Sequence, residues 1–237
     1  MNDRKLILRG EAALLLAIII NSIGVLLMLQ SGSGISAISS VPYAFSEVFT
    51  KLSLGTWTYI FQGLLVITLM ILKKRFVPSY LFSFAAGFMF GELMDINELW
   101  ITKLPMSIPL RIVYFVVSYV ILCFGIALSN RCKLPIIPTD LFPRDLSEIL
   151  NKPYSRVKIT FDVTCLLITA FLTYFVLGRI LGLGIGTVVA AFTMGKGVAI
   201  AGKLIDKKMT FVSFLQKELD DEEVVKMKSD KVIAAKS

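Results

Sequence analysis

Six long apolar blocks, separated by short polar segments, dominate the pattern of hydrophobic and polar positions along the chain. A helix needs roughly 20 apolar residues, at about 1.5 Å of rise each, to cross about 30 Å of hydrocarbon. The blocks that reach or nearly reach this length are Ala12–Leu29, Gly55–Leu72, Ser79–Ile96, Leu110–Ser129, Ile159–Leu177 and Leu183–Leu204. The pattern therefore predicts an all-α membrane protein with six transmembrane helices.

Two of the polar connectors each hold a short amphipathic segment. They are Pro42–Leu52, between the first two blocks, and Pro143–Leu150, between the fourth and fifth blocks. Proline is well tolerated in the first turn of a helix, so each segment is predicted to be a short helix with its proline in the first turn. Ser39 or Ser40 is the expected cap of the first, and Asp140 that of the second. Segments of this length cannot cross the bilayer, and they lie on its interface or re-enter it partway.

The basic residues of the connectors decide the predicted orientation, because cytoplasmic connectors carry an excess of Lys and Arg. With the N-terminus inside, fifteen basic connector residues up to Lys208 face the cytoplasm and four face outward. The outward four are Lys51, Lys103, Arg111 and Arg179. This distribution predicts that both termini are cytoplasmic, and it favours an even number of spans.

Composition narrows the classes of function. The chain is 56% hydrophobic with a mean hydropathy of +0.77, whereas soluble domains are about 45–50% apolar. The net charge of +8 comes from residues that flank the apolar blocks, so the expected partner is the lipid bilayer and not a nucleic acid. The chain has no histidine, and its three cysteines lack zinc-ligand spacing. We therefore expect no enzyme activity, no metal and no cofactor.

A shift of 101 residues lays the chain over itself, and the most informative match falls in the polar connectors. The motif P-x-x-x-S-E occurs in both. Its residues are Pro42, Ser46 and Glu47 in the first copy and Pro143, Ser147 and Glu148 in the second. Apolar helices match each other easily by chance, but a polar motif does not. The match predicts an internal duplication.

Each predicted half holds three spans, so the second half enters the membrane in the opposite sense to the first. Inverted-topology repeats of this kind recur in secondary transporters. The expected organisation is a transmembrane domain over 1–206, with repeat one at about 11–99 and repeat two at about 110–206, followed by a charged cytoplasmic tail over 207–237. The two motif glutamates either pair with Lys51 and Lys152 at i+4 or face a vestibule.

Ionisable residues inside the blocks are expensive at membrane depth, so they are usually paired or face water. Glu92 and Lys196 occupy matching repeat positions, each directly after a glycine, Gly91 or Gly195. One hypothesis is a buried ion pair, or a polar cavity that both residues line. The alternative is that each side chain extends to water at its own membrane end. The two glycines are expected to allow close helix packing.

Three further polar residues are candidates for a solute pathway. Asp162 lies one turn inside the fifth block, where it either lines the pathway or pairs at the interface with Arg156 and Lys158. Asn21 and Gln62 are amides in the middle of apolar blocks. Such amides usually hydrogen-bond neighbouring helices, and they can also contact a solute.

Several of these motifs resemble the YczE/YyaS/YitT group of bacterial integral membrane proteins. The resemblance rests on Gly24–Leu29, the P-x-x-x-S-E segment, Ala85–Ile96 and the G-T-x-x-x-A-x-x-x-G pattern of Gly186–Gly195, and it covers roughly Glu11 to Asp206. The Pro-Trp-Asp that is common in the group is replaced by Pro-Tyr-Ala at Pro42. The resemblance implies a six-helix protein of the bacterial plasma membrane and little about its chemistry.

The sequence favours a small inverted-repeat transporter or permease-like protein for a small polar solute. Two alternatives stay open: a regulatory or assembly factor that acts through its cytoplasmic tail, and a substrate-binding membrane subunit of a larger transporter. A homodimer or a partner membrane protein is compatible with each of them.

Overall fold

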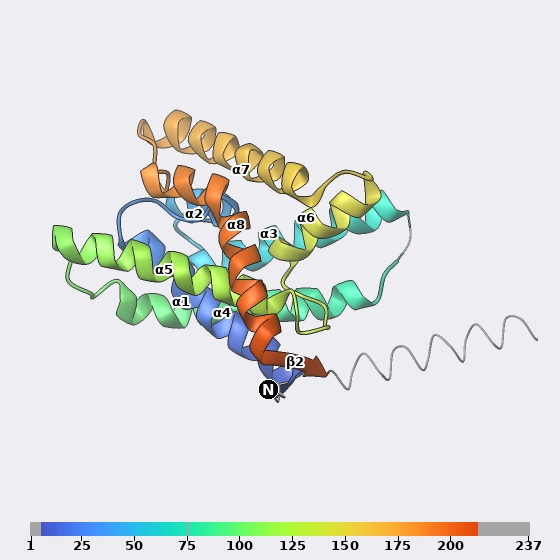
Figure 1. Cartoon of the computed structure of the whole chain (residues 1–237). Helices are drawn as coiled ribbons and strands as arrows, with labels where there is room; N and C mark the ends of the chain where they lie inside the picture. The colour runs from blue at the N-terminus through green and yellow to red at the C-terminus, as the bar shows by residue number, and fades with distance from the viewer. Residues whose placement is uncertain (1–5, 75, 213–237) are drawn as a thin grey trace, which may run out of the picture.

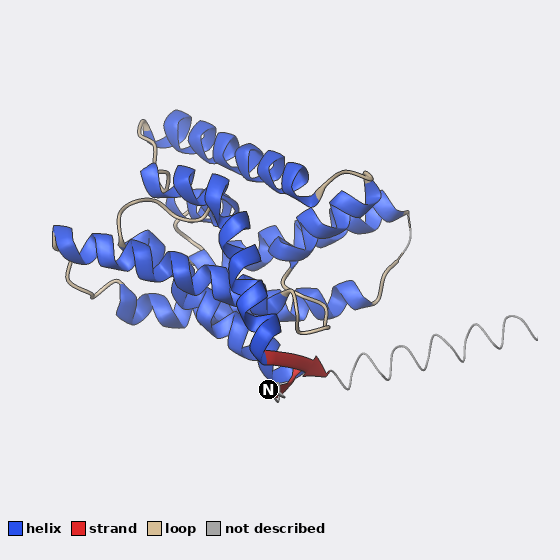
Figure 2. Ribbon diagram, in the orientation of Figure 1, coloured by secondary structure: helices blue, strands red, loops and turns tan. Residues whose placement is uncertain are grey.

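The computed structural model describes residues 6–74 and 76–212, and this part of the chain forms eight helices and two short strands (Figures 1 and 2). In chain order they are β1 (Leu6–Arg9), α1 (Gly10–Gln30), α2 (Ala37–Val48), α3 (Leu54–Lys73), α4 (Ser79–Ile101), α5 (Ile108–Ser129), α6 (Pro138–Ile149), α7 (Tyr154–Leu177), α8 (Ile185–Lys208) and β2 (Met209–Val212). The predicted tail lies outside the described residues from 213 onward.

Five of the described helices are long and apolar enough to cross a membrane: α1, α3, α5, α8 and Arg156–Leu177 of α7. They correspond to five of the six predicted spans. The remaining predicted span corresponds to helix α4, which has 23 residues. It is long enough to cross, but Glu92 and Asp95 interrupt its apolar sequence, and it is not among these five.

Large apolar side chains cover the outer faces of the bundle. Ile71 and Phe175 are each 69% exposed, and Leu167 and Phe171 are each 65% exposed. In water, burying a side chain of this size is favourable by about 1.5–3 kcal/mol, so contiguous faces of this kind are rare on soluble monomers. Such faces are stable in contact with lipid. Together with the long apolar helices, they indicate a membrane protein.

The helices pack around a central pair, α1 and α5, which lie side by side along most of their length. Glycines allow this close approach: a Cβ at Gly24 would lie 2.9 Å from the side chain of Leu122, and a Cβ at Gly125 would clash with Asn21. Helix α4 covers α1, and α8 covers α5. Helices α3 and α7 complete the bundle, each in contact with both α2 and α6.

Both polar connectors form helices, but each helix begins before its expected cap and places its proline in the interior. Ser36 and Ile137 stand at the cap positions, and Ser39, Ser40 and Asp140 lie inside the helices. Pro42 and Pro143 are the sixth residues of α2 and α6. A proline there donates no hydrogen bond to the carbonyl four residues before it, which leaves the carbonyls of Ile38 and Thr139 without that helical donor. Each helix has 12 residues, or about 18 Å of length, too little to cross a bilayer.

The start of α1 and the end of α8 lie side by side, because the strands next to them pair. β1 and β2 are parallel, with Leu6 opposite Met209 and Arg9 opposite Val212. These strands were not predicted from the sequence. The pairing brings two segments from opposite ends of the described chain to the same place (Figure 1).

Asp145 on α6 joins three helices through one carboxylate. It accepts hydrogen bonds from Lys73 Nζ at the end of α3 (2.8 Å), from Tyr80 Oη on α4, and from Arg144 Nε on its own helix (3.2 Å). Burial acts to raise the pKa of Asp145, but the bonds from Lys73 and Tyr80 and the neighbouring positive charges outweigh it and hold the pKa below its usual value. The ionised form is therefore the one that holds these helices together.

We expect Asp145→Ala to lower the free energy of unfolding by about 3 kcal/mol, because it leaves the half-buried Lys73 without its counter-ion and Tyr80 without its acceptor. The melting temperature of the purified protein in detergent checks this. Glu148→Ala is the matched control, since Glu148 is an exposed acid on the same helix. Equal melting temperatures for the two variants would contradict the role given to Asp145.

Candidate functional site

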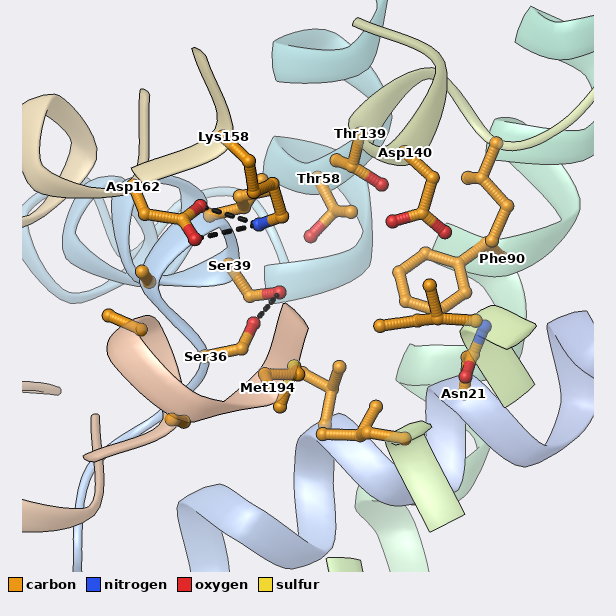
Figure 3. A pocket seen from close by; sticks show the side chains of 18 of the residues that line it. Asn21, Ser36, Ser39, Thr58, Phe90, Thr139, Asp140, Lys158, Asp162 and Met194 are labelled. Atoms are coloured by element: carbon orange, nitrogen blue, oxygen red, sulfur yellow. Dashed lines mark hydrogen bonds and ion pairs between the residues drawn. The ribbon is translucent and has the colours of Figure 1, made fainter. Parts of the chain in front are cut away.

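A cavity of about 60 Å³ lies inside the bundle, and all eight described helices contribute to its lining (Figure 3). A single water molecule needs roughly 10–15 Å³ of such space, so the cavity can hold a few waters or a solute of a few heavy atoms. Larger hollows of about 290 and 590 Å³ are lined mainly by exposed apolar residues of the outer faces. The central cavity is the better candidate site because polar groups converge on it.

The first turns of both short helices line this cavity, although the helices are more than 100 residues apart in the chain. The first N–H groups of a helix have no acceptor within the helix, and they carry a partial positive charge. In the described structure, the N–H groups of Ala37, Ile38 and Ser39 in α2 donate to no protein acceptor. Three backbone donors at the start of α2 therefore lack a protein acceptor, and their residues line the cavity.

Lys158 and Asp162 form a bidentate ion pair on the cavity wall. Lys158 Nζ lies 2.6 Å and 2.8 Å from the two carboxylate oxygens of Asp162, one helical turn further along α7. The Asp162 side chain is only 5% exposed. Asp162 therefore has both of the arrangements that the sequence suggested as alternatives: it pairs with Lys158, and it lines the cavity.

Asp140 supplies a second carboxylate to the cavity, on the third residue of α6. In the described part of the chain, its side chain accepts no hydrogen bond and forms no ion pair within 4 Å. Burial raises the pKa of Asp140 to about 6, the charges of Lys158 and Arg144 lower it, and the charge of Asp162 raises it. Asp140 can therefore exchange a proton near neutral pH.

Two buried amides complete the polar interior. Asn21, on α1, is 3% exposed and lines the cavity, and its Oδ1 has no partner among the described residues. Gln62, on α3, is fully buried, and neither polar atom of its side chain has a partner there. Gln62 lies outside the cavity lining, against Gly87 of α4. An unpaired buried polar group costs about 1–3 kcal/mol. Asn21 Oδ1 lies against Gly125 of α5, where a Cβ would be 2.0 Å away.

The structure does not bring Glu92 and Lys196 together. Both side chains are exposed, neither lines the central cavity, and the ion pairs of the described residues do not include them. Their helices turn these side chains to the outer faces of the bundle. Gly91 lies against α3, where a Cβ would be 2.7 Å from the carbonyl oxygen of Gly55, whereas Gly195 has open space beside it.

The P-x-x-x-S-E motif has the same local geometry in both copies. Ser46 Oγ donates to the carbonyl of Tyr43 (2.8 Å), and Ser147 Oγ donates to the carbonyl of Arg144 (2.6 Å). Neither expected i+4 ion pair, Glu47–Lys51 or Glu148–Lys152, is among the ion pairs of the described residues. The motif shapes the two short helices, and of its residues Pro42 also lines the cavity.

Most of the polar residues that line the cavity were not predicted from the sequence as site residues, among them Ser36, Ser39, Thr58, Thr139 and Asp140. A signal for two of them existed. The 101-residue shift that aligns the two motifs also places Ser39 over Asp140. Two polar residues at equivalent positions just before a repeated motif could have indicated a shared site.

We expect ionised Asp140 to cost stability. Its folded pKa of about 6 lies above its ordinary value of 3.8, so the folded state binds the proton more tightly than the unfolded state does. The wild type should therefore lose stability as the pH rises from about 4 to above 6, by about 3 kcal/mol. Melting curves of Asp140→Asn should lack this loss. Glu148→Gln, a change at an exposed acid of the same helix, should retain it, and a loss of equal size in Asp140→Asn would contradict the assignment.

Comparison with known proteins gives one match. Residues 8–203 match a family described as a family of unknown function (DUF6198). No curated protein and no solved structure matches the chain significantly. The resemblance to the YczE/YyaS/YitT group stays a prediction. Since the match covers most of the chain, this membrane protein belongs to the DUF6198 family.

Proposed function

We propose that this chain is a small inverted-repeat transporter or permease-like protein, and that a small polar solute occupies the central cavity. The observation that carries the proposal is the meeting of two short helices, one from each half of the chain, at a polar cavity that all eight described helices line. Transporters place their substrate sites at such repeat interfaces, near interrupted helices. In this proposal the solute is moved without chemical conversion.

The packing of the helices supports two equivalent halves, α1–α4 and α5–α8. Within the first half α1 packs on α4 and α2 on α3, and within the second half α5 packs on α8 and α6 on α7. Contacts between the halves also come in pairs: α2 with α7 matches α6 with α3, and α2 with α8 matches α6 with α4. A two-fold relation between the halves accounts for this pairing.

The strand pairing supports an even number of crossings. β1 leads into α1 and β2 follows α8, so the two helix ends lie on the same side of the protein. Five crossings would place these ends on opposite sides of the membrane. We therefore propose that α4 is the sixth span, and that the excess of basic residues puts both ends in the cytoplasm of a bacterial cell.

The cavity lining is divided between the halves, which suits alternating access. Asn21 and Thr58 come from the first half, and Asp140, Lys158 and Ala191 from the second. A rocking motion of one half against the other changes which side of the membrane the site faces without dismantling either half. The Asp145 contacts to Lys73 and Tyr80 cross between the halves and must break or move in such a motion.

Filling the cavity should block solute binding and transport. Ala191→Phe introduces a ring into the lining, and Ala199→Phe makes the same change at an exposed position of the same helix. A thermal-shift screen of small polar metabolites and inorganic ions against the wild type identifies the solute, since binding raises stability. We expect uptake of that solute into proteoliposomes to fall about tenfold or more in Ala191→Phe, which corresponds to about 1.4 kcal/mol.

Ala199→Phe should retain uptake, and both variants should elute as folded protein on gel filtration. Equal uptake by Ala191→Phe and the wild type would place the solute path elsewhere. If no compound from the screen is taken up and an ATPase co-purifies with the chain, the chain is a substrate-binding membrane subunit of a larger transporter and not a transporter by itself.

The opposite orientation of the halves predicts opposite labelling of equivalent residues. Lys51 and Lys152 are 101 residues apart, and both are exposed just after a short helix. The three native cysteines are buried, so Lys51→Cys and Lys152→Cys can be labelled with little background. A membrane-impermeant maleimide applied to whole cells should label the first and not the second. Lys207→Cys should behave like Lys152→Cys, and labelling of all three from outside would rule out the inversion.

A further inference from the structure

We propose that a groove between α6 and α7 binds one anionic phospholipid, with its phosphate on Lys152 and Arg156 and an acyl chain against the apolar side chains of the two helices. The α6–α7 groove is an open hollow of about 360 Å³ on the outer surface of the bundle, separate from the central cavity. Its lining joins two basic side chains to an apolar wall. The inference goes beyond the proposed function and does not depend on it.

One end of the groove is positively charged, and the described residues that line the groove include no acid. Lys152 and Arg156 are both exposed, and within the described part of the chain neither takes part in an ion pair or a side-chain hydrogen bond. The hydroxyl of Thr160, one turn after Arg156 on α7, also makes no hydrogen bond there. A phosphate matches these groups, because the planar guanidinium of arginine donates to two phosphate oxygens at once and lysine adds a compact positive charge.

The remaining wall of the groove is mostly apolar. Leu146 and Leu150 lie one turn apart at the end of α6, and Val157 and Phe161 lie one turn apart on α7. Phe161 packs against Phe142 of α6, with ring centroids 4.8 Å apart, so the two helices are in contact beneath the groove. A groove with a cationic end and an apolar wall matches a molecule divided in the same way, an acidic head group joined to hydrocarbon.

The charged end of the groove lies at the depth of a lipid head group. Arg156 is the first residue of the stretch Arg156–Leu177, which is apolar enough to cross a membrane, and Lys152 precedes it. Basic residues at the ends of spans lie near the lipid phosphates, and basic pockets between helices bind anionic head groups. Thr164 lines the groove two turns after Arg156, or about 12 Å further along α7. The groove therefore runs from the membrane surface toward the interior of the bilayer.

At the equivalent positions, the first half of the chain carries aromatic rings. The 101-residue shift places Phe45 over Leu146 and Phe49 over Leu150. Phe45 and Phe49 of the first half stack against Trp57 of α3, with ring centroids 5.0 and 5.8 Å apart. Leu146 and Leu150 are smaller, and the groove lies beside them. A molecule from outside the chain can occupy in the second half the space that these rings fill in the first.

Phosphatidylglycerol and phosphatidylcholine with the same acyl chains test the need for negative charge. Native mass spectrometry of the purified full-length protein in detergent counts the bound lipids, and thermal shift measures their dissociation constants. We expect phosphatidylglycerol to bind at least about tenfold more tightly than phosphatidylcholine, because only the former has a net negative charge. Glycerol 3-phosphate, which has the phosphate without the acyl chains, should bind much more weakly than phosphatidylglycerol.

Removal of the two basic side chains tests the position of the phosphate. The double variant Lys152→Gln with Arg156→Gln should weaken phosphatidylglycerol binding by about tenfold or more, since each basic residue near the membrane surface helps to hold an anionic lipid. The double variant Lys207→Gln with Lys208→Gln is the matched control. It removes the same charge from two exposed lysines at the end of α8, outside the groove, and should retain binding. All four side chains are exposed, so both double variants should melt at the wild-type temperature without lipid.

A larger side chain in the apolar wall tests the position of the acyl chain. Leu150→Trp places a ring in the groove and should weaken phosphatidylglycerol binding, whereas Leu167→Trp, at an exposed position of α7 outside the groove, should not. Equal affinity of the wild type for phosphatidylglycerol and phosphatidylcholine, or for phosphatidylglycerol and glycerol 3-phosphate, would overturn the inference. So would equal losses of affinity in the two double variants, or wild-type affinity in Leu150→Trp.

Discussion

A helix that begins inside a membrane protein leaves several backbone N–H groups without acceptors, and lipid cannot provide them. Helices α2 and α6 both begin in this way, at the centre of the bundle. The structure can tolerate two such starts only where polar groups or water meet them. The central cavity, its hydroxyl groups and its ion pair follow from that requirement. The remaining helices form an apolar shell that keeps the cavity away from lipid.

Two carboxylates on α6 show how position decides the behaviour of the same group. Asp145 lies five residues after Asp140 and accepts bonds from Lys73, Tyr80 and Arg144, so its pKa is lowered. Asp140 has no such bond among the described residues, and burial raises its pKa. A single helix therefore carries a permanent charge that holds three helices together and a proton-exchanging group that faces the cavity.

Local patterns predicted much of the fold and little of the site. Apolar blocks of sufficient length indicated the long helices, and the repeated motif located both short helices. The starts of these helices were missed because residues such as Ile38 and Ile137 are apolar, and only the three-dimensional path of the chain exposes them to a cavity. The pairing of β1 with β2 was missed because it joins residues about 200 positions apart, and local periodicity carries no information about such contacts.

Glu92 and Lys196 show the limit of reasoning from symmetry. In an inverted repeat, equivalent positions would lie at mirrored depths. A helix, however, turns through a full circle every 3.6 residues, so the symmetry does not say which way a side chain points. Asp140 and Ser39, another equivalent pair, do line one cavity. The difference lies in the helix phase, which a single sequence gives only where an apolar stripe marks the buried face. In α4 and α8 both faces are apolar, one toward protein and one toward lipid.

The parallel pairing of β1 and β2 has a mechanical consequence. It joins the first element of one half to the last element of the other through backbone hydrogen bonds, at the face where α1 begins and α8 ends. Two bodies fastened at one edge cannot separate there, and their relative displacement grows with distance from the fastening. In the rocking motion proposed above, any large opening between α1–α4 and α5–α8 would occur at the opposite face, with the paired strands as its pivot.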